Sequence, residues 1–286
     1  MQTAHFVITL FNLALWDADK HHSPTRTAAW LDRRCGLFET FCLPSMMAQK
    51  GARALRAWLV FFDAATPEPV RRRIEDWRRL CPALTPLFFT ADQVRGFTGT
   101  SMGRRVDFIT SAIDSLLTTA DRLVITTNLD NDDALASDAL ARIEDAAREG
   151  CVVSLTRGWQ YFTAIRAVTA MTYPHNHFLS LCECAGSPLR TIESMSHRRA
   201  RQHYQVIDLD GAPGWLEVVH DSNVSNELRI TSRIRYRRLR GAVSLAPFGL
   251  DLSFTPPEQR RANRRLTLLF VRVALWRLRR KLFRRS

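Results

Sequence analysis

Short apolar segments alternate with amphipathic segments along the first 155 residues, and this alternation constrains the fold most strongly. The apolar segments have the length of buried strands and cover 6–10, 57–63, 84–89, 122–127 and 151–155. The segments between them have helical periodicity and cover 27–41, 66–80, 107–119 and 137–150, the last with Ser137 as its expected N-cap. Strands and helices that alternate in this way form a mostly parallel sheet with helices on both faces. The expected fold class is therefore α/β.

After residue 156 the alternation becomes less regular. The sequence predicts a strand or hairpin over 161–171, a short apolar segment over 178–184 and a strand over 216–220. It shows no internal repeat, no low-complexity linker and no separate second core. We therefore expect one domain over 1–255, followed by a basic amphipathic tail helix over 256–286.

The positive charge of the chain is concentrated in this tail. The formal net charge is +13, and residues 260–286 carry ten Arg, one Lys and no acid, which is +11 and leaves +2 for the rest. A body that binds a nucleic-acid groove would itself be basic, so we do not expect a nucleic-acid partner.

The tail combines its arginines with an apolar stripe. Leucines and a valine recur at spacings of three and four residues, at Leu268, Val271, Leu275, Leu278 and Leu282. Such a helix is typical of attachment to an anionic membrane surface. The alternative is a helix packed on its own domain or on a partner subunit.

The remaining sequence features bear on cellular location. The six cysteines follow no disulfide or zinc spacing, which predicts free thiols in a reducing compartment. No apolar run is long enough to span a membrane, and the apolar segment 6–16 lacks the basic start and the cleavage site of a signal peptide. We expect a cytoplasmic protein that attaches peripherally to the inner face of the cell membrane through its tail.

Three carboxylates, Asp130, Asp132 and Asp133, follow the strand predicted over 122–127. Ligands of open α/β sheets bind outside the carboxyl ends of the strands. Neighbouring carboxylates repel one another unless a cation joins them, and Mg²⁺ or Mn²⁺ prefers oxygen ligands. The sequence therefore predicts a divalent metal site. The alternative is that Asp132 and Asp133 cap a helix that begins near Ala134.

Five stretches together carry a family resemblance. They are Thr9-Leu-Phe-Asn12, residues 30–45, residues 58–63, Leu129-Asp-Asn-Asp-Asp-Ala-Leu135, and residues 215–220 with Asn223. On these stretches the sequence resembles the rhamnosyltransferase family of bacterial proteins, and its acidic segment resembles the Asp-x-Asp motif of GT-A glycosyltransferases. That family tends to have Arg before the Leu-Asp-Asn-Asp-Asp core, where this sequence has Asn128. The difference concerns donor specificity and not the metal site.

The resemblance implies a GT-A-like enzyme that transfers a sugar, such as rhamnose, from a nucleotide-sugar donor to a hydroxyl of a glycan or lipid-linked acceptor. A Mn²⁺ or Mg²⁺ ion on the donor pyrophosphate would neutralise the charge that develops as the glycosyl–phosphate bond breaks. The metal ligands that it implies are Asp130, Asp132, Asp133 and the late histidine His220. Alternatively, His220 is a surface or core histidine.

Several further residues are candidates for donor binding or catalysis. Asn12 and Asp63, at the ends of two strands, are expected to contact the nucleobase or ribose of the donor. Arg34 and Arg105 are expected to contact its phosphates, and Asp130 to bind the donor through the metal. The alternatives are a turn residue for Asn12, a loop-capping acid for Asp63 and solvated helix faces for the arginines. An inverting reaction also needs a base. Glu183 is the first candidate because its apolar neighbours would raise its pKa, and Glu193 and Asp221 are alternatives; each could instead pair with an arginine.

Two other classes of function remain open from the sequence. One is a nucleotidyl or phosphoryl transferase with the same acidic metal site, which would release pyrophosphate instead of free sugar and nucleoside diphosphate. The other is a non-catalytic protein that binds nucleic acid or membrane through its tail. Deletion of 258–286 would abolish all function of such a binder but would leave an enzyme with turnover in solution.

Overall fold

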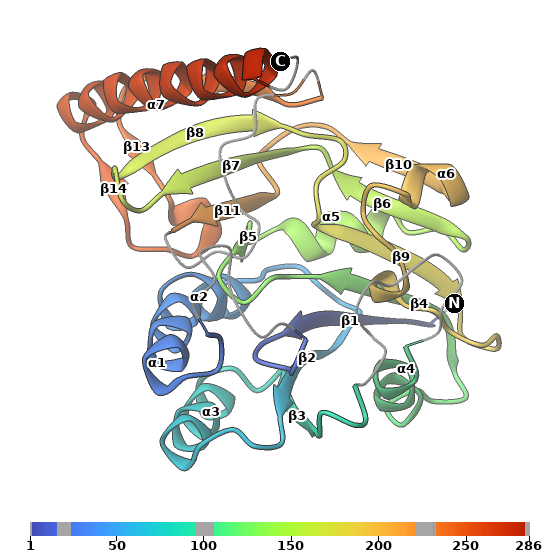
Figure 1. The fold of residues 1–286 in the computed structure, drawn as a ribbon. Helices are drawn as coiled ribbons and strands as arrows, with labels where there is room; N and C mark the ends of the chain where they lie inside the picture. Colours follow the sequence, from blue (N-terminus) through green and yellow to red (C-terminus); the bar gives the residue numbers. More distant parts are fainter. Residues whose placement is uncertain (1, 16–23, 95–105, 221–230, 232, 284–286) are drawn as a thin grey trace.

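The structure, a computed structural model, describes residues 2–15, 24–94, 106–220, 231 and 233–283. Its central feature is a seven-stranded sheet (Figure 1) with the strand order β10 (Gln205–Leu209), β6 (Cys151–Leu155), β9 (Leu179–Cys184), β4 (Asp121–Asn128), β1 (Gln2–Leu10), β2 (Leu55–Asp63) and β3 (Leu84–Phe89). Only β9 runs antiparallel to its neighbours. The predicted α/β fold with a mostly parallel sheet is confirmed.

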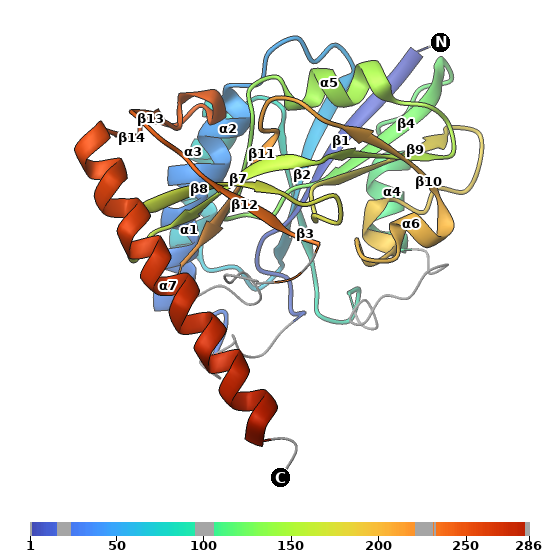
Figure 2. The same cartoon turned by 90° about the horizontal axis from the view of Figure 1, so that it is seen from above.

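Helices cover both faces of this sheet (Figures 1 and 2) because successive strand residues point to opposite sides. The helices are α1 (Ala28–Leu37), α2 (Leu43–Met47), α3 (Glu68–Leu80), α4 (Asp107–Asp114), α5 (Ala139–Ala146) and α6 (Ala200–His203). Val7 and Trp58 pack into one core with α1, α2, α3 and α5, whereas Phe6 and Phe61 pack into a second core with α4 and α6. Burying each of these aromatic rings contributes about 1.5–3 kcal/mol.

Helix α1 begins where the sequence predicts a helix, with the Thr27 hydroxyl accepting a hydrogen bond from the Trp30 N–H at 3.3 Å. The helical segment that the sequence predicts to end at residue 41 continues beyond it. A π-helical turn over Phe38–Cys42 leads directly into α2, so the chain stays helical to Met47.

Two predictions about the segment after the acidic residues are wrong. Residues Ala134–Leu135 form the short strand β5, so no helix begins there for Asp132 and Asp133 to cap. Helix α5 begins at Ala139, and Ser137 does not cap it because Asp138 occupies the N-cap position. The acidic segment therefore lies between two strands, which removes the helix-capping alternative.

The less regular second half of the chain forms a second sheet that the sequence did not predict. Its order is β12 (Arg235–Arg238), β8 (Ala167–Thr172), β7 (Arg157–Phe162), β11 (Trp215–Val219) and β5, and a small third sheet pairs β13 (Val243–Ser244) with β14 (Ser253–Phe254). The predicted hairpin over 161–171 corresponds to β7 and β8.

Trp215 joins the second sheet to the first. Its ring stacks on Phe178 with 4.9 Å between centroids, and its Nε1–H donates to the Leu155 carbonyl at 2.8 Å. It also lies directly over Gly158, where a Cβ atom would stand 2.1 Å from the indole. Because β11 pairs with β5 through Leu216 and Ala134, this packing holds the end of β11 beside the acidic segment.

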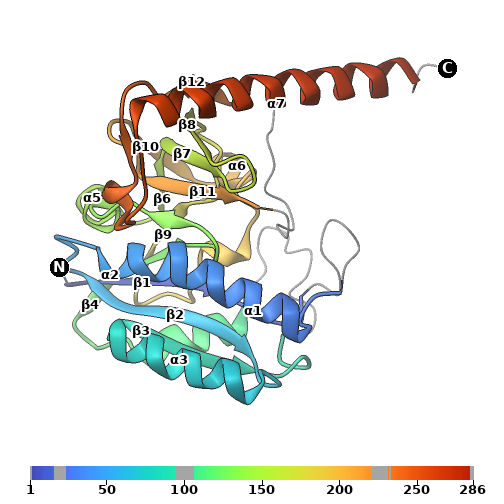
Figure 3. The same cartoon turned by 90° about the vertical axis from the view of Figure 1, so that its left-hand side faces the viewer.

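The C-terminal helix α7 (Pro256–Phe283) packs on the second sheet through its first turns, where Ala262 and Leu266 contact Phe162 and Ala167. Figure 3 shows the rest of the helix extending past the strands. On the part of α7 whose side chains are described, Leu268, Val271, Leu275 and Trp276 are about half exposed or more. No described helix combines the length and apolar character that a membrane span requires.

Candidate functional site

The acidic loop, residues 129–133, follows β4 and is fastened to the end of β1. The Leu129 N–H donates to the Ile8 carbonyl at 3.0 Å, and the Thr9 hydroxyl donates to the Leu129 carbonyl at 2.7 Å. The Asn131 side chain donates to the Phe11 carbonyl at 2.7 Å. These bonds fix the backbone of the loop, so the positions of its carboxylates are set by the central sheet.

On one side of the acidic loop lies a charge-balanced cluster of Arg34, Asp132 and His220. One carboxylate oxygen of Asp132 bonds both the Arg34 guanidinium at 2.7 Å and His220 Nε2 at 2.8 Å. The same guanidinium donates to the Asn131 side-chain oxygen at 3.0 Å and lies 4.9 Å from the centre of the Trp30 ring. All three side chains of the cluster are buried. Three stretches of the family resemblance therefore meet at Asp132.

On the other side lies an acid-rich cluster of Asp130, Asp133 and His177. His177 Nε2 stands 2.9 Å from a carboxylate oxygen of Asp133 and 3.6 Å from one of Asp130. The second oxygen of Asp133 accepts the Val218 N–H at 2.7 Å. Asp133 is fully buried, whereas the side chain of Asp130 is 48% exposed and opens the cluster to solvent.

The two clusters shift the pKa values of adjacent carboxyls in opposite directions. Burial acts against ionisation of both groups, but Arg34 and His220 stabilise the ionised Asp132 and lower its pKa to about 2. Burial raises the pKa of Asp133 well above its usual range, and the charges of Asp132 and Asp130 raise it further. The acid-rich cluster therefore has an excess of negative charge that a cation would relieve.

The donor atoms of the acid-rich cluster suit a divalent cation. One atom from each of Asp130, Asp133 and His177 lies within 4.8 Å of the other two. Two carboxylates and an imidazole are suitable ligands for Mn²⁺ and related metals, and the exposure of Asp130 leaves a side open for further ligands. These residues fit the metal that the family resemblance implies.

The predicted metal ligands are thus divided between the clusters. Asp130 and Asp133 lie in the acid-rich cluster, whereas Asp132 and His220 are bonded to each other. Arg34, predicted to hold phosphate, reaches the same loop but pairs with Asp132. Ligation by Asp132 and His220, and phosphate binding by Arg34, stay predictions.

Sequence reasoning missed His177. Its signal is its place directly before an apolar segment that forms β9. Because β9 runs antiparallel to β4, with Ser180 opposite Thr127, the residue before β9 lies at the end of β4. Recognising that single reversed strand would have placed His177 beside the acidic loop.

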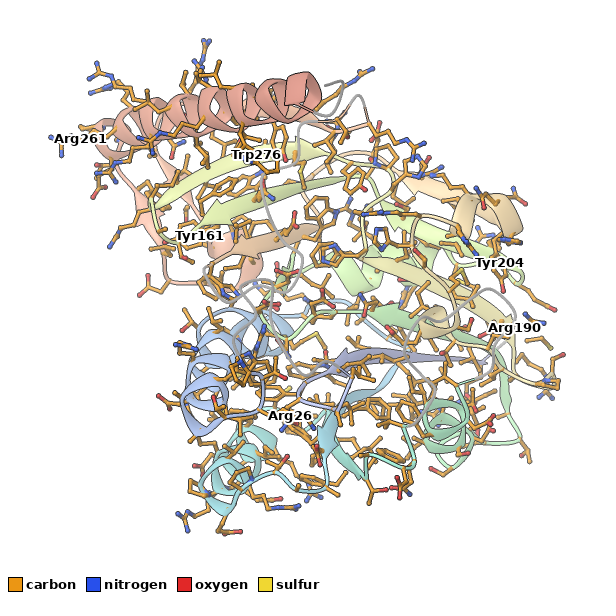
Figure 4. All side chains as sticks on the ribbon, in the orientation of Figure 1. Arg26, Tyr161, Arg190, Tyr204, Arg261 and Trp276 are labelled. Carbon is orange, nitrogen blue, oxygen red and sulfur yellow. The ribbon has the colours of Figure 1, made fainter. Side chains whose placement is uncertain are left out.

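The two predicted donor residues at the ends of β1 and β2 lie together. The Asp63 N–H donates to the side-chain oxygen of Asn12 at 3.1 Å, and the Asn12 amide donates to the Thr66 hydroxyl at 3.1 Å. One carboxylate oxygen of Asp63 accepts the Ala65 N–H at 2.8 Å, and the other lies 3.5 Å from Arg26, which is labelled in Figure 4. Both side chains therefore stabilise the turn after β2, and their contact with a donor stays a prediction.

The predicted base Glu183 does not lie with the acidic loop. It stands opposite Val124, towards the start of β4, and its two carboxylate oxygens accept the N–H groups of Arg190 and Thr191 at 2.9 and 3.0 Å. Burial raises its pKa, as the sequence suggested. The structure thus places Glu183 where it holds the chain segment that leads to Glu193.

Glu193 lies close enough to Asp130 for the two charges to interact. It belongs to a short 3-10 turn, Ile192–Ser194, which is held to β4 by a 2.9 Å bond from the Ile192 N–H to the Thr126 hydroxyl. Burial and the nearby charge of Asp130 raise the pKa of Glu193 to about 8. The remaining candidates, Arg105 and Asp221, lie outside the described residues, as does Asn223.

Three solved structures are distantly similar to this chain. S. aureus TarS (residues 1–349) is 11% identical, with a TM-score of 0.38 over 76% of this chain and 60% of that chain. Mouse xyloside xylosyltransferase 1 is 13% identical, with a TM-score of 0.29 over 54% and 52% of the two chains. A 4-diphosphocytidyl-2C-methyl-D-erythritol synthase is 13% identical, with a TM-score of 0.34 over 80% and 94%. This chain therefore spans 60% of the first of these structures.

A comparison at the level of sequence families is more informative. No curated protein matches the chain significantly. The family described as "Putative rhamnosyl transferase" matches residues 18–232, about three quarters of the chain. That range includes the acidic loop and both clusters around it. The chain belongs to the rhamnosyl transferase family of glycosyltransferases.

Proposed function

We propose that this protein transfers a sugar from a nucleotide-sugar donor to a hydroxyl of a glycan or lipid-linked acceptor, with a Mn²⁺ or Mg²⁺ ion held by Asp130, Asp133 and His177. The observation that carries this proposal is the acid-rich cluster, in which two carboxylates and an imidazole converge at the carboxyl end of β4. A divalent ion there supplies positive charge against the diphosphate that leaves the sugar.

The neighbouring residues serve to position the donor. Asn12 and Asp63 lie at the ends of β1 and β2, on the same edge of the sheet as the acidic loop. There they contact the nucleobase or ribose of the donor. Arg34 fixes Asp132, and a second role for its guanidinium is to contact a donor phosphate.

Glu193 is the residue that takes the proton from the acceptor hydroxyl if the reaction inverts the anomeric centre. It lies near the charge of Asp130 on a turn held to β4. Its raised pKa suits a base near neutral pH, because the Brønsted optimum for a catalytic group lies near the operating pH. Asp221 remains an alternative.

The tail is the part of the molecule that brings the enzyme to an anionic membrane surface. Residues 1–255 form the transferase domain, and residues 256–286 form the tail. Leu268, Val271 and Leu275 recur along one stripe of α7, opposite the side that carries Ala262 and Leu266. The exposed Arg264 and Arg272 lie beside this stripe, and Arg261 and Trp276 are labelled along α7 in Figure 4. An exposed apolar stripe flanked by arginines suits the interface of an anionic bilayer.

Donor binding is tested by saturation-transfer NMR with a panel of sugar nucleotides, with and without Mn²⁺. We expect one sugar nucleotide to bind in a Mn²⁺-dependent way, and Asp130→Asn to lose that binding while the surface variant Asp145→Asn keeps it. Release of free sugar and nucleoside diphosphate supports a glycosyltransferase. Release of pyrophosphate would instead identify a nucleotidyl transferase and refute the proposal.

Membrane attachment is tested by co-sedimentation with vesicles of phosphatidylglycerol and of phosphatidylcholine. Deletion of the whole tail is a poor variant, because the first turns of α7 cover Phe162 and Ala167. The triple variant Leu268→Ser, Val271→Ser, Leu275→Ser changes only exposed positions. We expect the wild type to sediment with phosphatidylglycerol vesicles but not with phosphatidylcholine vesicles. The triple variant should stay in solution with both. Equal sedimentation of both proteins would contradict the role of the stripe.

A further inference from the structure

A groove separate from the acidic loop lies between the edges of the two large sheets. Its walls include Thr156 and Pro174, the end of β10 with Asp208 and Asp210, and the segment that enters β12 with Arg233 and Arg235. Its volume is about 410 Å³. Pockets of roughly 300–1,000 Å³ are typical of small-ligand sites.

The carboxylates of this groove already have cationic partners. Both oxygens of Asp208 accept hydrogen bonds from the Arg201 guanidinium, one of them at 3.0 Å. Asp210 accepts a hydrogen bond from the Thr156 hydroxyl and lies 3.6 Å from Arg157. The negative charge of the groove is therefore neutralised by residues other than Arg233 and Arg235.

Arg233 and Arg235 add a positive charge that nothing in the groove balances. Both side chains are exposed, and within the described part of the chain neither forms an ion pair. Arg237 is also exposed and continues the row, because alternate residues of β12 point to the same face. Guanidinium groups in such a row match phosphate and carboxylate oxygens, which they bind in a bidentate way.

The groove lies next to the acid-rich cluster. Pro174 in its wall is only three residues before His177, so the two are within about 10 Å of each other along the chain. The residues between the two arginines face the other way: Ile234 and Tyr236 line a small pocket that His177 also lines. The groove and this pocket therefore lie on opposite sides of β12, and Pro174 is the point of the groove wall that comes near His177.

On the basis of the function proposed above, we propose that this groove binds a negatively charged group of the acceptor, a phosphate or a carboxylate, through Arg233 and Arg235. The acceptor is then an anionic glycan that passes Pro174 on its way to the acid-rich cluster. The other source of the same chemistry is the pyrophosphate of the donor, so the experiment has to separate the two.

The test is an NMR titration of the metal-free protein with inorganic phosphate and with glucuronate, with glucose as the uncharged control. We expect both anions to bind saturably and glucose not to bind. The double variant Arg233→Gln, Arg235→Gln should weaken anion binding by about tenfold or more, because each guanidinium contributes charge-assisted hydrogen bonds. The charge-matched control is Arg72→Gln, Arg78→Gln, whose side chains on α3 are 69% and 59% exposed.

Two results would overturn the proposal. Equal anion affinity in the wild type and the double variant would leave the arginines with only the role of protecting an edge strand from pairing. Binding of UDP, GDP or dTDP in the groove only when Mn²⁺ is present would assign the groove to the donor. Mn²⁺ titration of the same samples keeps the proposed function separate, since failure of metal binding would refute that function without altering the result for the groove.

Discussion

The charge-balanced cluster and the acid-rich cluster share one short loop, yet they shift the pKa of an aspartate in opposite directions. Asp132 meets Arg34 and His220, and its pKa falls to about 2. The next residue, Asp133, meets two other carboxylates and no arginine at bonding distance among the described contacts, and its pKa rises. The side chains that distant elements supply therefore decide whether a buried carboxylate stabilises the fold in an ion pair or remains available to bind a cation.

Replacing Asp132 should have the largest effect on stability. Asp132→Asn leaves the buried Arg34 guanidinium without its carboxylate, and breaking a buried ion pair typically costs about 3–5 kcal/mol. Urea denaturation measures the loss of unfolding free energy. The control Asp145→Asn, in an exposed pair with Arg53, should cost no more than about 1 kcal/mol. Similar losses in both variants would show that Asp132 does not anchor the cluster.

His177 and His220 should differ in how much their replacement weakens stabilisation by Mn²⁺. At one hundred times its dissociation constant, Mn²⁺ should stabilise the wild type by about 2.7 kcal/mol, seen as a rise in thermal midpoint. His177→Gln should lose most of this rise because it removes a ligand of the acid-rich cluster. His220→Gln should keep it. The reverse outcome would restore His220 as the metal ligand that the sequence predicts.

The pH dependence should reveal the lowered pKa of Asp132. Between about pH 2 and pH 4 the unfolded chain binds more protons at this residue than the folded chain, so stability rises with pH across that interval. A shift of nearly two pKa units corresponds to about 2 kcal/mol, present above pH 4 and lost as the pH falls to 2. Acid titration of the unfolding free energy measures it. Asp132→Asn should lack this component, and an identical slope in both proteins would contradict the assignment.

Replacing Glu183 should have the smallest effect on stability and on Mn²⁺ binding, although the sequence favoured this residue as the base. Glu183→Gln weakens the bonds from the Arg190 and Thr191 N–H groups, which should cost about 1 kcal/mol of stability. Its effect on Mn²⁺ binding should be nil, because it lies opposite Val124 and away from the acidic loop. Complete loss of transfer activity in a stable Glu183→Gln protein would instead make it catalytic.

The sequence predicted the parallel part of the fold because that part depends on local patterns. Apolar runs such as 57–63 are long enough to identify buried strands without knowledge of their neighbours. The acidic loop was predicted for the same reason, since its carboxylates directly follow such a run. The family resemblance then identified the chemistry and the stretches that meet there.

The remaining features depend on contacts between distant residues. The pairing of β11 with β5, which removes the expected helix near Ala134, joins residues about eighty positions apart. The reversed strand β9 brings His177 to the acidic loop and takes Glu183 away from it. Neither follows from hydrophobic periodicity, because an antiparallel and a parallel strand in a buried sheet have the same apolar pattern.

The most direct test of the central claim is a Mn²⁺ titration followed by electron paramagnetic resonance on the wild type, Asp133→Asn and Asp145→Asn. We predict one bound ion per chain in the wild type and in Asp145→Asn, and an affinity at least about tenfold weaker in Asp133→Asn. Equal Mn²⁺ affinity in all three proteins would contradict the assignment of the acid-rich cluster as the metal site.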